Sequence, residues 1–207
     1  MSSACNWSNR RPGSRSSIVG VLCLCGLALS GCAALPGGGT PALDTVTLTS
    51  VSAAPKARHG RVQVLVAEPK ALKIFDSQNI VVATSPTALE YLGGVQWADR
   101  LPSLVQAKLA ESLQNAGVAG GVGLPGQGLA IDYQLITEIR DFAVHTDGGA
   151  RAHVAVFATV LNDRNGTVRA SREFSATVPA GGDYVSALNK AFEAVASDIV
   201  TWMGQSL

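Results

Sequence analysis

The stretch EIRDFAVHTDGGARAHVAVFATV, residues 138–160, carries the pattern that decides the fold. In the strand predicted over residues 129–144, apolar side chains occupy odd positions up to Ile139 and even positions from Phe142. Successive side chains of a strand point to opposite faces, so this change of parity predicts a β-bulge near Arg140-Asp141.

The next strand keeps its apolar residues at even positions, from Ala152 to Val160. Pairing Val144 with Ala152 leaves a three-residue loop, Asp147-Gly148-Gly149, a common type with glycine in the left-handed conformation. The sequence NDRNG (162–166) then turns the chain into a third strand. One face of that strand carries Val168, Ala170, Phe174, Ala176 and Val178. These features predict an antiparallel three-stranded meander.

Three further strands precede this meander. Residues 45–52, 61–68 and 79–84 alternate or are β-branched, as strands are. Residues 88–98, ALEYLGGVQWA, have the form of a tight hairpin in which Gly93-Gly94 supplies the positive φ angles of a two-residue turn.

Two helices are expected. The first begins after Asp99, a possible N-cap, has Pro102 in its first turn and ends at Gly117. The second starts at Asp183, and its apolar residues recur at intervals of three and four. That stripe, which should cover the sheet, consists of Val185, Leu188, Phe192, Val195, Ile199 and Trp202.

The first 31 residues have the features of a secretory signal peptide. Three arginines precede the apolar run 18–29, which is too short to span a membrane. The run ends in Leu29-Ser30-Gly31-Cys32, which resembles the lipobox of bacterial lipoproteins. We therefore expect Cys32 to carry the lipid and residues 32–44 to form a lipidated flexible tether. Residue 33, next to the predicted lipidated cysteine, is not aspartate. This favours anchoring at the periplasmic face of the outer membrane.

Composition limits the function of the remaining residues, 45–207, which are expected to form one domain. Three of the four cysteines belong to the leader, so neither a disulfide nor a cysteine metal cluster is expected. Without the leader arginines the 16 basic residues fall to 13, against 15 acidic ones, a net charge of −2. This balance gives no reason to expect nucleic-acid binding.

Two patterns invite a cofactor or metal interpretation. The glycine-rich segment 117–128 contains G-x-G-x-x-G, but a dinucleotide site needs a strand before it and a helix after it, and here the expected order is reversed. We expect a mobile loop. His145 and His153 should lie diagonally on the outer face of their hairpin, where no clear third ligand is evident. No cofactor and no metal are therefore expected.

Residues 91–117 and 138–176 resemble the ABC-type transport auxiliary lipoproteins. The marks are an aromatic hairpin with Trp-Ala before an amphipathic helix, a long strand ending at Phe142, the strand ASREFSA (170–176) and a helix ending near Trp202. The likeness covers about residues 45–203. It implies a single α/β domain with a mixed, mostly antiparallel sheet covered by helices, in a three-layer, anticodon-binding-like arrangement.

The resemblance also implies a function. Members are similar to accessory lipoproteins of MCE-type (mammalian cell entry) lipid transport systems, so the expected partners are an MCE-domain protein and its ABC permease/ATPase complex. The expected role is non-enzymatic docking. The alternative is an independent periplasmic carrier that holds an apolar ligand in a cavity. An enzyme is the third class, but the sequence contains neither G-x-S-x-G nor H-E-x-x-H.

The predicted hairpin suggests where a partner docks. With Gly93-Gly94 as its turn, Tyr91 pairs with Gln96 on one face, while Trp97 lies on the other, beside the start of a buried helix. We assign Trp97 to the core. Tyr91 and Gln96 are the predicted contact for the MCE partner or for a second copy of the chain, which would make a homo-oligomer.

Overall fold

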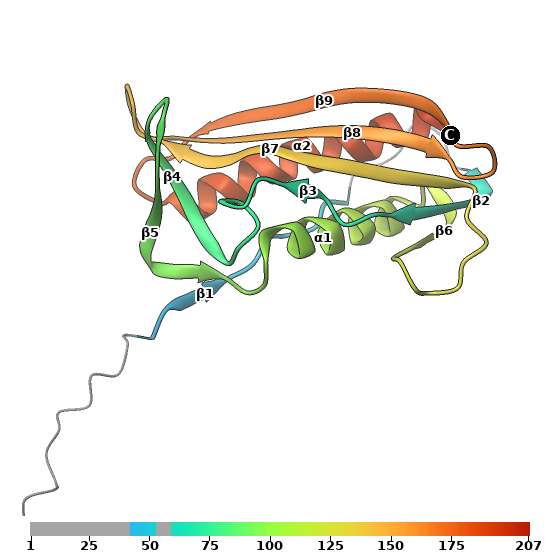
Figure 1. Ribbon diagram of the computed structural model, residues 1–207, viewed down its shortest axis with the longest axis horizontal. Helices are drawn as coiled ribbons and strands as arrows, with labels where there is room; N and C mark the ends of the chain where they lie inside the picture. The colour runs from blue at the N-terminus through green and yellow to red at the C-terminus, as the bar shows by residue number, and fades with distance from the viewer. Residues whose placement is uncertain (1–41, 53–58) are drawn as a thin grey trace, which may run out of the picture. The chain divides into compact units, whose positions relative to one another are not determined.

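The computed structural model describes residues 42–52 and 59–207. The unit 42–207 is compact and consists of one nine-stranded mixed sheet with two helices (Figure 1). Its elements are β1 Asp44–Val46, β2 His59–Val66, β3 Lys70–Ala71, β4 Asn79–Ser85, β5 Ala88–Trp97, α1 Leu101–Ala116, β6 Ala119–Gly123, β7 Tyr133–His145, β8 Arg151–Asn162, β9 Thr167–Pro179 and α2 Tyr184–Ser206. The predicted single domain with a mixed sheet is confirmed.

Strand β7 organises the sheet. One of its edges pairs along its whole length with β8, which in turn pairs with β9, all antiparallel. Its other edge pairs in succession with β2, β3 and β4, all parallel. β6 extends the sheet beyond β2, and β5 and β1 extend it beyond β4. The longest pairings of the described residues are thus the antiparallel ones of the meander.

The predicted β7 bulge is present. Ile139 pairs with Val156 and Asp141 with Ala155, which leaves Arg140 as the extra residue. The expected partners of Val144 and Phe142 are also correct, Ala152 and Val154. The connection is longer than predicted, since the last pair is His145 with Arg151 and the loop comprises residues 146–150.

Strand β9 contains a second irregularity that the sequence pattern did not predict. Leu161 pairs with Val168 and Val160 with Ala170, so Arg169 is an extra residue. Val168 consequently points away from the core and is exposed, contrary to the prediction, whereas Phe174 is buried as expected.

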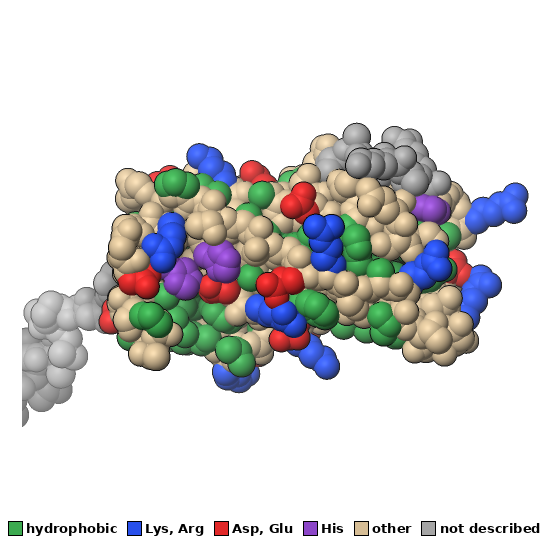
Figure 2. Space-filling view, turned by 90° about the horizontal axis from the view of Figure 1, so that it is seen from above, with side chains coloured by type: hydrophobic (Ala, Val, Ile, Leu, Met, Phe, Trp, Pro, Cys, Tyr) green, Lys and Arg blue, Asp and Glu red, His purple; other side chains and the backbone are tan. Residues whose placement is uncertain are grey.

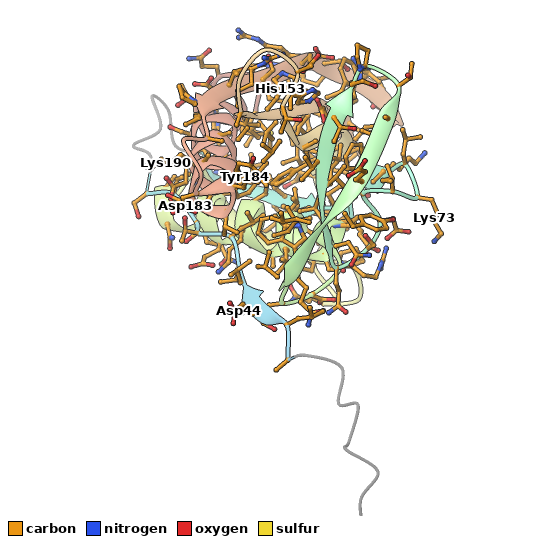
Figure 3. All side chains as sticks on the ribbon, turned by 90° about the vertical axis from the view of Figure 1, so that its left-hand side faces the viewer. Asp44, Lys73, His153, Asp183, Tyr184 and Lys190 are labelled. Atoms are coloured by element: carbon orange, nitrogen blue, oxygen red, sulfur yellow. The ribbon has the colours of Figure 1, made fainter. Side chains whose placement is uncertain are left out.

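Both helices pack against the same face of the sheet, which arches over them in the end-on view of Figure 3. α2 begins as predicted, because the Asp183 side chain accepts a hydrogen bond from the Ser186 amide. In the predicted stripe, the residues from Leu188 to Ile199 are fully buried and those at the two ends are half-buried. The described residues therefore form two layers, a sheet and a helical layer, rather than the three that the resemblance implied.

The glycine pair at 93–94 does not form a hairpin turn. β5 is one continuous strand, and the turn that joins it to β4 lies at residues 86–87. Between the pairs Asn79–Gln96 and Val81–Tyr91 the register shifts, and Gly94 has φ 81°. Gly-Gly can serve a bulge as well as a turn, because glycine permits positive φ in either setting.

The predicted strand 45–52 is also wrong over most of its length. Only Asp44–Val46 pairs with another strand, β5. The following residues run along the helices: the Thr49 amide donates to Asn189 Oδ1 at 2.9 Å and the Val51 amide to Ser112 Oγ at 3.0 Å. Helix side chains thus take the place of a neighbouring strand, and Leu48, which directly precedes Thr49, is fully buried.

The glycine-rich segment 117–128 begins as a strand, not as a loop. β6 pairs with β2 in parallel, and a Cβ added to Gly120 would lie 2.1 Å from the Gly60 carbonyl oxygen. Glycine is therefore required here for a close approach of two backbones, which accounts for the composition without a phosphate ligand.

The ends of α1 were predicted in part. Pro102 lies in its first turn, and Gly117 at its C-terminus has the expected left-handed conformation, φ 64°. Asp99 does not cap it: the N-cap residue is Arg100, and Asp99 Oδ1 accepts from the amide of Arg100, its immediate neighbour.

Candidate functional site

The sheet face opposite the helices bears the side chains that are candidates for function (Figure 2). Cross-strand partners in a sheet point to the same side, so the register places them in rows. One row runs from Tyr91 on β5 through Val81 and Ala143 to His153 on β8. We call the open face the region defined by Leu89, Tyr91, Asp141, His145 and His153.

A second row of the open face lies one step along the strands. It runs from Leu89 on β5 through Ala83 on β4 to His145 on β7. Leu89 is 43% exposed and Tyr91 50% exposed, and both are on the same side of β5 because they are two residues apart.

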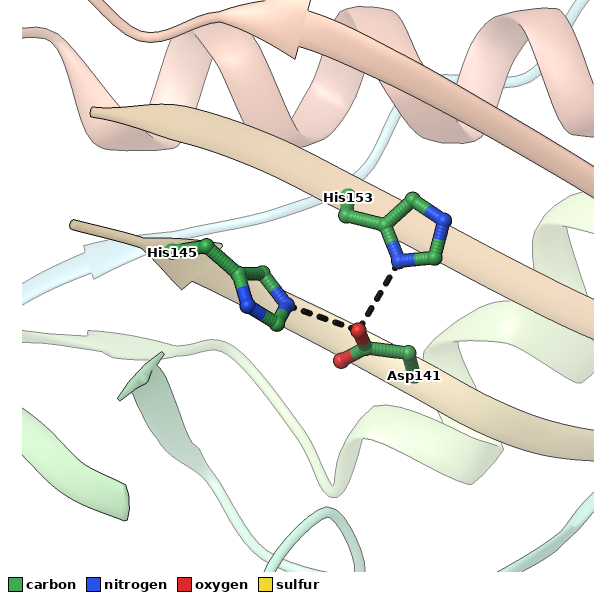
Figure 4. Close-up of side chains that lie close together, drawn as sticks. All are labelled: Asp141, His145 and His153. Atoms are coloured by element: carbon green, nitrogen blue, oxygen red, sulfur yellow. Dashed lines mark hydrogen bonds and ion pairs between the residues drawn. The ribbon is translucent and has the colours of Figure 1, made fainter. Parts of the chain in front are cut away.

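Three polar side chains of the open face converge on one point (Figure 4). Asp141 Oδ2 accepts hydrogen bonds from His145 Nε2 at 2.7 Å and from His153 Nδ1 at 2.8 Å. The two imidazole rings are 5.8 Å apart between centroids and meet edge to face, at 76°. The side chains are only partly exposed, between 22 and 31%. We call these three residues the His-Asp-His cluster.

The local backbone explains why the cluster forms. The bulge at Arg140 turns Asp141 outward, and His145, four residues later on the same strand, points to the same face because alternate residues of a strand share a side. Ala143 lies between them and pairs with His153 on β8. Because the alanine side chain is small, the three longer side chains can meet above it.

The outward, diagonal placement predicted for the two histidines is confirmed, whereas Asp141 was not predicted as their partner. The signal was present, since the predicted bulge itself reverses the parity and turns Asp141 outward.

Two arginines flank the cluster, and each has a carboxylate partner of its own. Arg151 donates to Asp147 Oδ1 at 3.2 Å. Arg140 forms an ion pair with Glu173 and lies over the Phe157 ring, 4.2 Å from its centroid. The Asp141 carboxylate is therefore left to the two histidines.

The structure separates the two residues proposed as a partner contact. Tyr91 and Gln96 are not cross-strand partners, because they lie on the same strand on either side of the register shift. Gln96 pairs with Thr45 of β1 and donates from Nε2 to Thr45 Oγ1 at 3.4 Å. Trp97 is 1% exposed, in agreement with its assignment to the core.

Two ion pairs away from the open face lower the pKa of a carboxyl group. Hydrogen bonds from Arg100, and then from Lys73, hold the pKa of Asp76 below its ordinary value. The pKa of Asp132 is lowered by a hydrogen bond from the Gln63 amide, 2.9 Å away, and by Arg164. Asp132 thereby joins β2 to the segment that leads into β7.

The predicted signal peptide, residues 1–31, and Cys32, the predicted lipid attachment residue, lie outside the described residues, as does most of the predicted tether. Residues 42–44 are described, and Asp44 is already part of β1. Of the two helices in the part of the chain that the structure describes, neither has the length and hydropathy of a membrane-spanning segment.

Comparison with known proteins gives a family match and two similar folds. The family model for the ABC-type transport auxiliary lipoprotein component matches residues 45–200. An uncharacterised protein of Bradyrhizobium diazoefficiens is 31% identical over 185 residues, 84% of this chain and 48% of that protein. The chain thus spans about half the length of this curated relative.

The similar folds come from two crystal structures. One, from Xanthomonas campestris, belongs to a protein assigned to a family of unknown function. It has a TM-score of 0.68 and 24% identity, over 79% of this chain and 97% of that one. The other, of an uncharacterised protein, has a TM-score of 0.59 and 14% identity over the same shares. At these identities the two structures show a shared fold.

Proposed function

The chain belongs to the ABC-type transport auxiliary lipoprotein family, and from this premise we propose that it is a non-enzymatic docking component of an MCE-type lipid transport system. In this proposal Cys32 carries the lipid that anchors the protein at the periplasmic face of the outer membrane. An MCE-domain protein, associated with an ABC permease and ATPase, binds the folded domain. The family is one of transport accessory lipoproteins and not of enzymes, which supports a binding role.

The observation that carries the docking proposal is the pair of exposed apolar side chains on β5. Leu89 and Tyr91 are side by side on the open face, each between two-fifths and one-half exposed. Tyrosine is enriched at protein interfaces, where its ring is buried and its hydroxyl stays polar. Tyr91 therefore remains the proposed contact, with Leu89 in place of Gln96 as its neighbour.

The carrier alternative receives less support from the described residues. A site for an apolar ligand is usually an enclosed, mostly apolar cavity. Small residues of β8, including Ala152 and Ala158, are fully buried in the same core as Ala187 and Ala191 of α2. A surface depression of about 470 Å³ exists beside β3, but its lining includes the charged residues Lys70, Glu138 and Arg140.

The docking proposal can be tested by capture of the MCE-domain protein from the same genome on the membrane-anchored chain. Leu89→Ala and Tyr91→Ala should each reduce capture strongly. Leu72→Ala is the matched control, because Leu72 is 66% exposed but follows β3 instead of lying on β5. Undiminished capture by both β5 variants, or an equal loss with Leu72→Ala, would place the docking surface elsewhere.

The anchoring proposal has a separate test. Cys32→Ala should leave the protein unprocessed or released from the outer membrane, while its circular dichroism spectrum stays that of the folded domain. Membrane fractionation measures the difference. Recovery of the wild-type protein in the soluble periplasmic fraction would contradict lipid anchoring.

A further inference from the structure

We propose that the His-Asp-His cluster of Asp141, His145 and His153 is a binding site for a divalent transition-metal ion of the zinc class. Two imidazole nitrogens and one carboxylate oxygen are ligands that zinc accepts, and three protein ligands leave a fourth position open. This inference rests on the cluster alone and does not depend on the docking proposal.

The positions of the donor atoms suit such an ion. The three atoms lie within 4.8 Å of one another in the described structure. Bonds of about 2.0–2.2 Å in a tetrahedral site place neighbouring ligand atoms about 3.3–3.6 Å apart. The present separations of 2.7 and 2.8 Å between the carboxylate oxygen and the two nitrogens would have to open by about 0.5–0.9 Å. Small side-chain rotations provide a shift of that size without a change in the strands.

The residues at the base of the cluster leave space for an ion and do not supply a fourth ligand. Buried Ala143 and Ala155 lie at the base of the site, opposite His153 and Asp141 respectively. Neither can coordinate a metal, and neither fills the space above the cluster. Since the three ligand side chains are partly exposed, an ion can enter from solvent and its fourth position faces outward.

Local charge also favours a cation. Asp141 is the acidic member of the cluster, and the two neighbouring arginines are paired with Asp147 and Glu173. A divalent ion would therefore find an available carboxylate and two imidazoles that already point at this carboxylate. All three side chains belong to the paired strands β7 and β8, which hold them in place. Holding ligands in place before binding lowers the entropy lost when the ion binds.

Zinc titration of the purified full-length chain in detergent tests the site. Its four cysteines are first alkylated, because thiolates are strong zinc ligands and would obscure the result. Isothermal titration calorimetry should then give one zinc ion per chain. His145→Ala, His153→Ala and Asp141→Asn should each weaken binding by at least about tenfold, since even residues that only hydrogen-bond to a metal ligand contribute about 10- to 100-fold.

His59→Ala is the matched control, because His59 is elsewhere and its Nε2 contacts the Gly204 carbonyl oxygen at 3.1 Å. It should bind zinc like the wild type. X-ray absorption at the zinc edge of the wild-type chain tests the site without relying on a variant's folding, and should show two imidazole nitrogens at about 2.0–2.1 Å. The proposal is overturned if the alkylated chain takes up no zinc, if the three variants bind like the wild type, or if the spectrum lacks the two imidazoles.

Discussion

Replacing Trp97 with alanine removes the largest fully buried side chain of the described residues. Its ring meets Phe142 edge to face, with centroids 5.9 Å apart, and Phe142 in turn contacts Phe192 of α2. Truncation of a buried aromatic residue costs about 3–5 kcal/mol, and loss of an aromatic pair adds about 0.5–1.5 kcal/mol. We expect Trp97→Ala to lower the free energy of unfolding by about 3.5–6.5 kcal/mol, a large share of the roughly 5–15 kcal/mol of an ordinary domain.

Urea unfolding followed by circular dichroism measures this loss, because the signal does not depend on the tryptophan that has been removed. Trp97→Phe should lose much less, since it keeps an aromatic ring against Phe142. Tyr91→Ala, on the same strand but half-exposed, should change stability by about 1 kcal/mol or less. A loss below about 1.5 kcal/mol for Trp97→Ala would refute the assignment of this residue to the centre of the core, because buried aromatic truncations cost at least twice that.

Two further predictions concern the glycine-rich strand and acid stability. Gly120→Ala should lower the melting temperature, because the added Cβ would meet the Gly60 carbonyl oxygen. Gly93→Ala is the control and should leave the melting temperature unchanged, because Gly93 has nothing within 4 Å of an added Cβ and no positive φ. Equal effects of the two substitutions would contradict the close approach of Gly120 to Gly60. The folded-state pKa of Asp132 is lowered, so its carboxylate stabilises the fold above about pH 4 and this contribution is lost as the pH falls through the folded pKa. The Asp132→Asn variant should therefore be less stable than the wild type at pH 7, and the difference in stability should shrink below about pH 4. Urea unfolding midpoints measured across this pH range test the prediction. A difference that stays constant with pH would contradict the lowered pKa of Asp132.

The meander could be predicted because its alternation is strong and one face is buried. A strand that covers a core must keep its apolar residues on one side, so the change of parity after Ile139 had a single simple explanation, a bulge. The helix starting at Asp183 was predictable for the same reason. Its apolar stripe and its N-cap are both determined by residues close together in the sequence.

The remaining errors arise where the sequence pattern does not specify the hydrogen-bonding partner. Gly93-Gly94 can form a turn or a bulge, and the sequence does not show that β4 pairs with β5 on both sides of the two glycines. Residues 47–52 have strand composition, but their backbone bonds to Asn189 and Ser112 of two distant helices. Strand β6 was missed because its glycines provide no side-chain alternation to recognise.

The candidate site depends on the same bulge that the core requires. Ile139 and Phe142 are both fully buried although three positions separate them, which an uninterrupted strand cannot achieve on one face. The extra residue, Arg140, corrects the parity for the core, and by doing so it assigns Asp141 to the outer face with His145. A regular strand would turn either Phe142 outward or Ile139 outward. In the first case Asp141 and His145 would both face the core, while His153 on β8 stayed on the outer face. The burial of one aromatic ring therefore fixes the position of the carboxylate in the cluster.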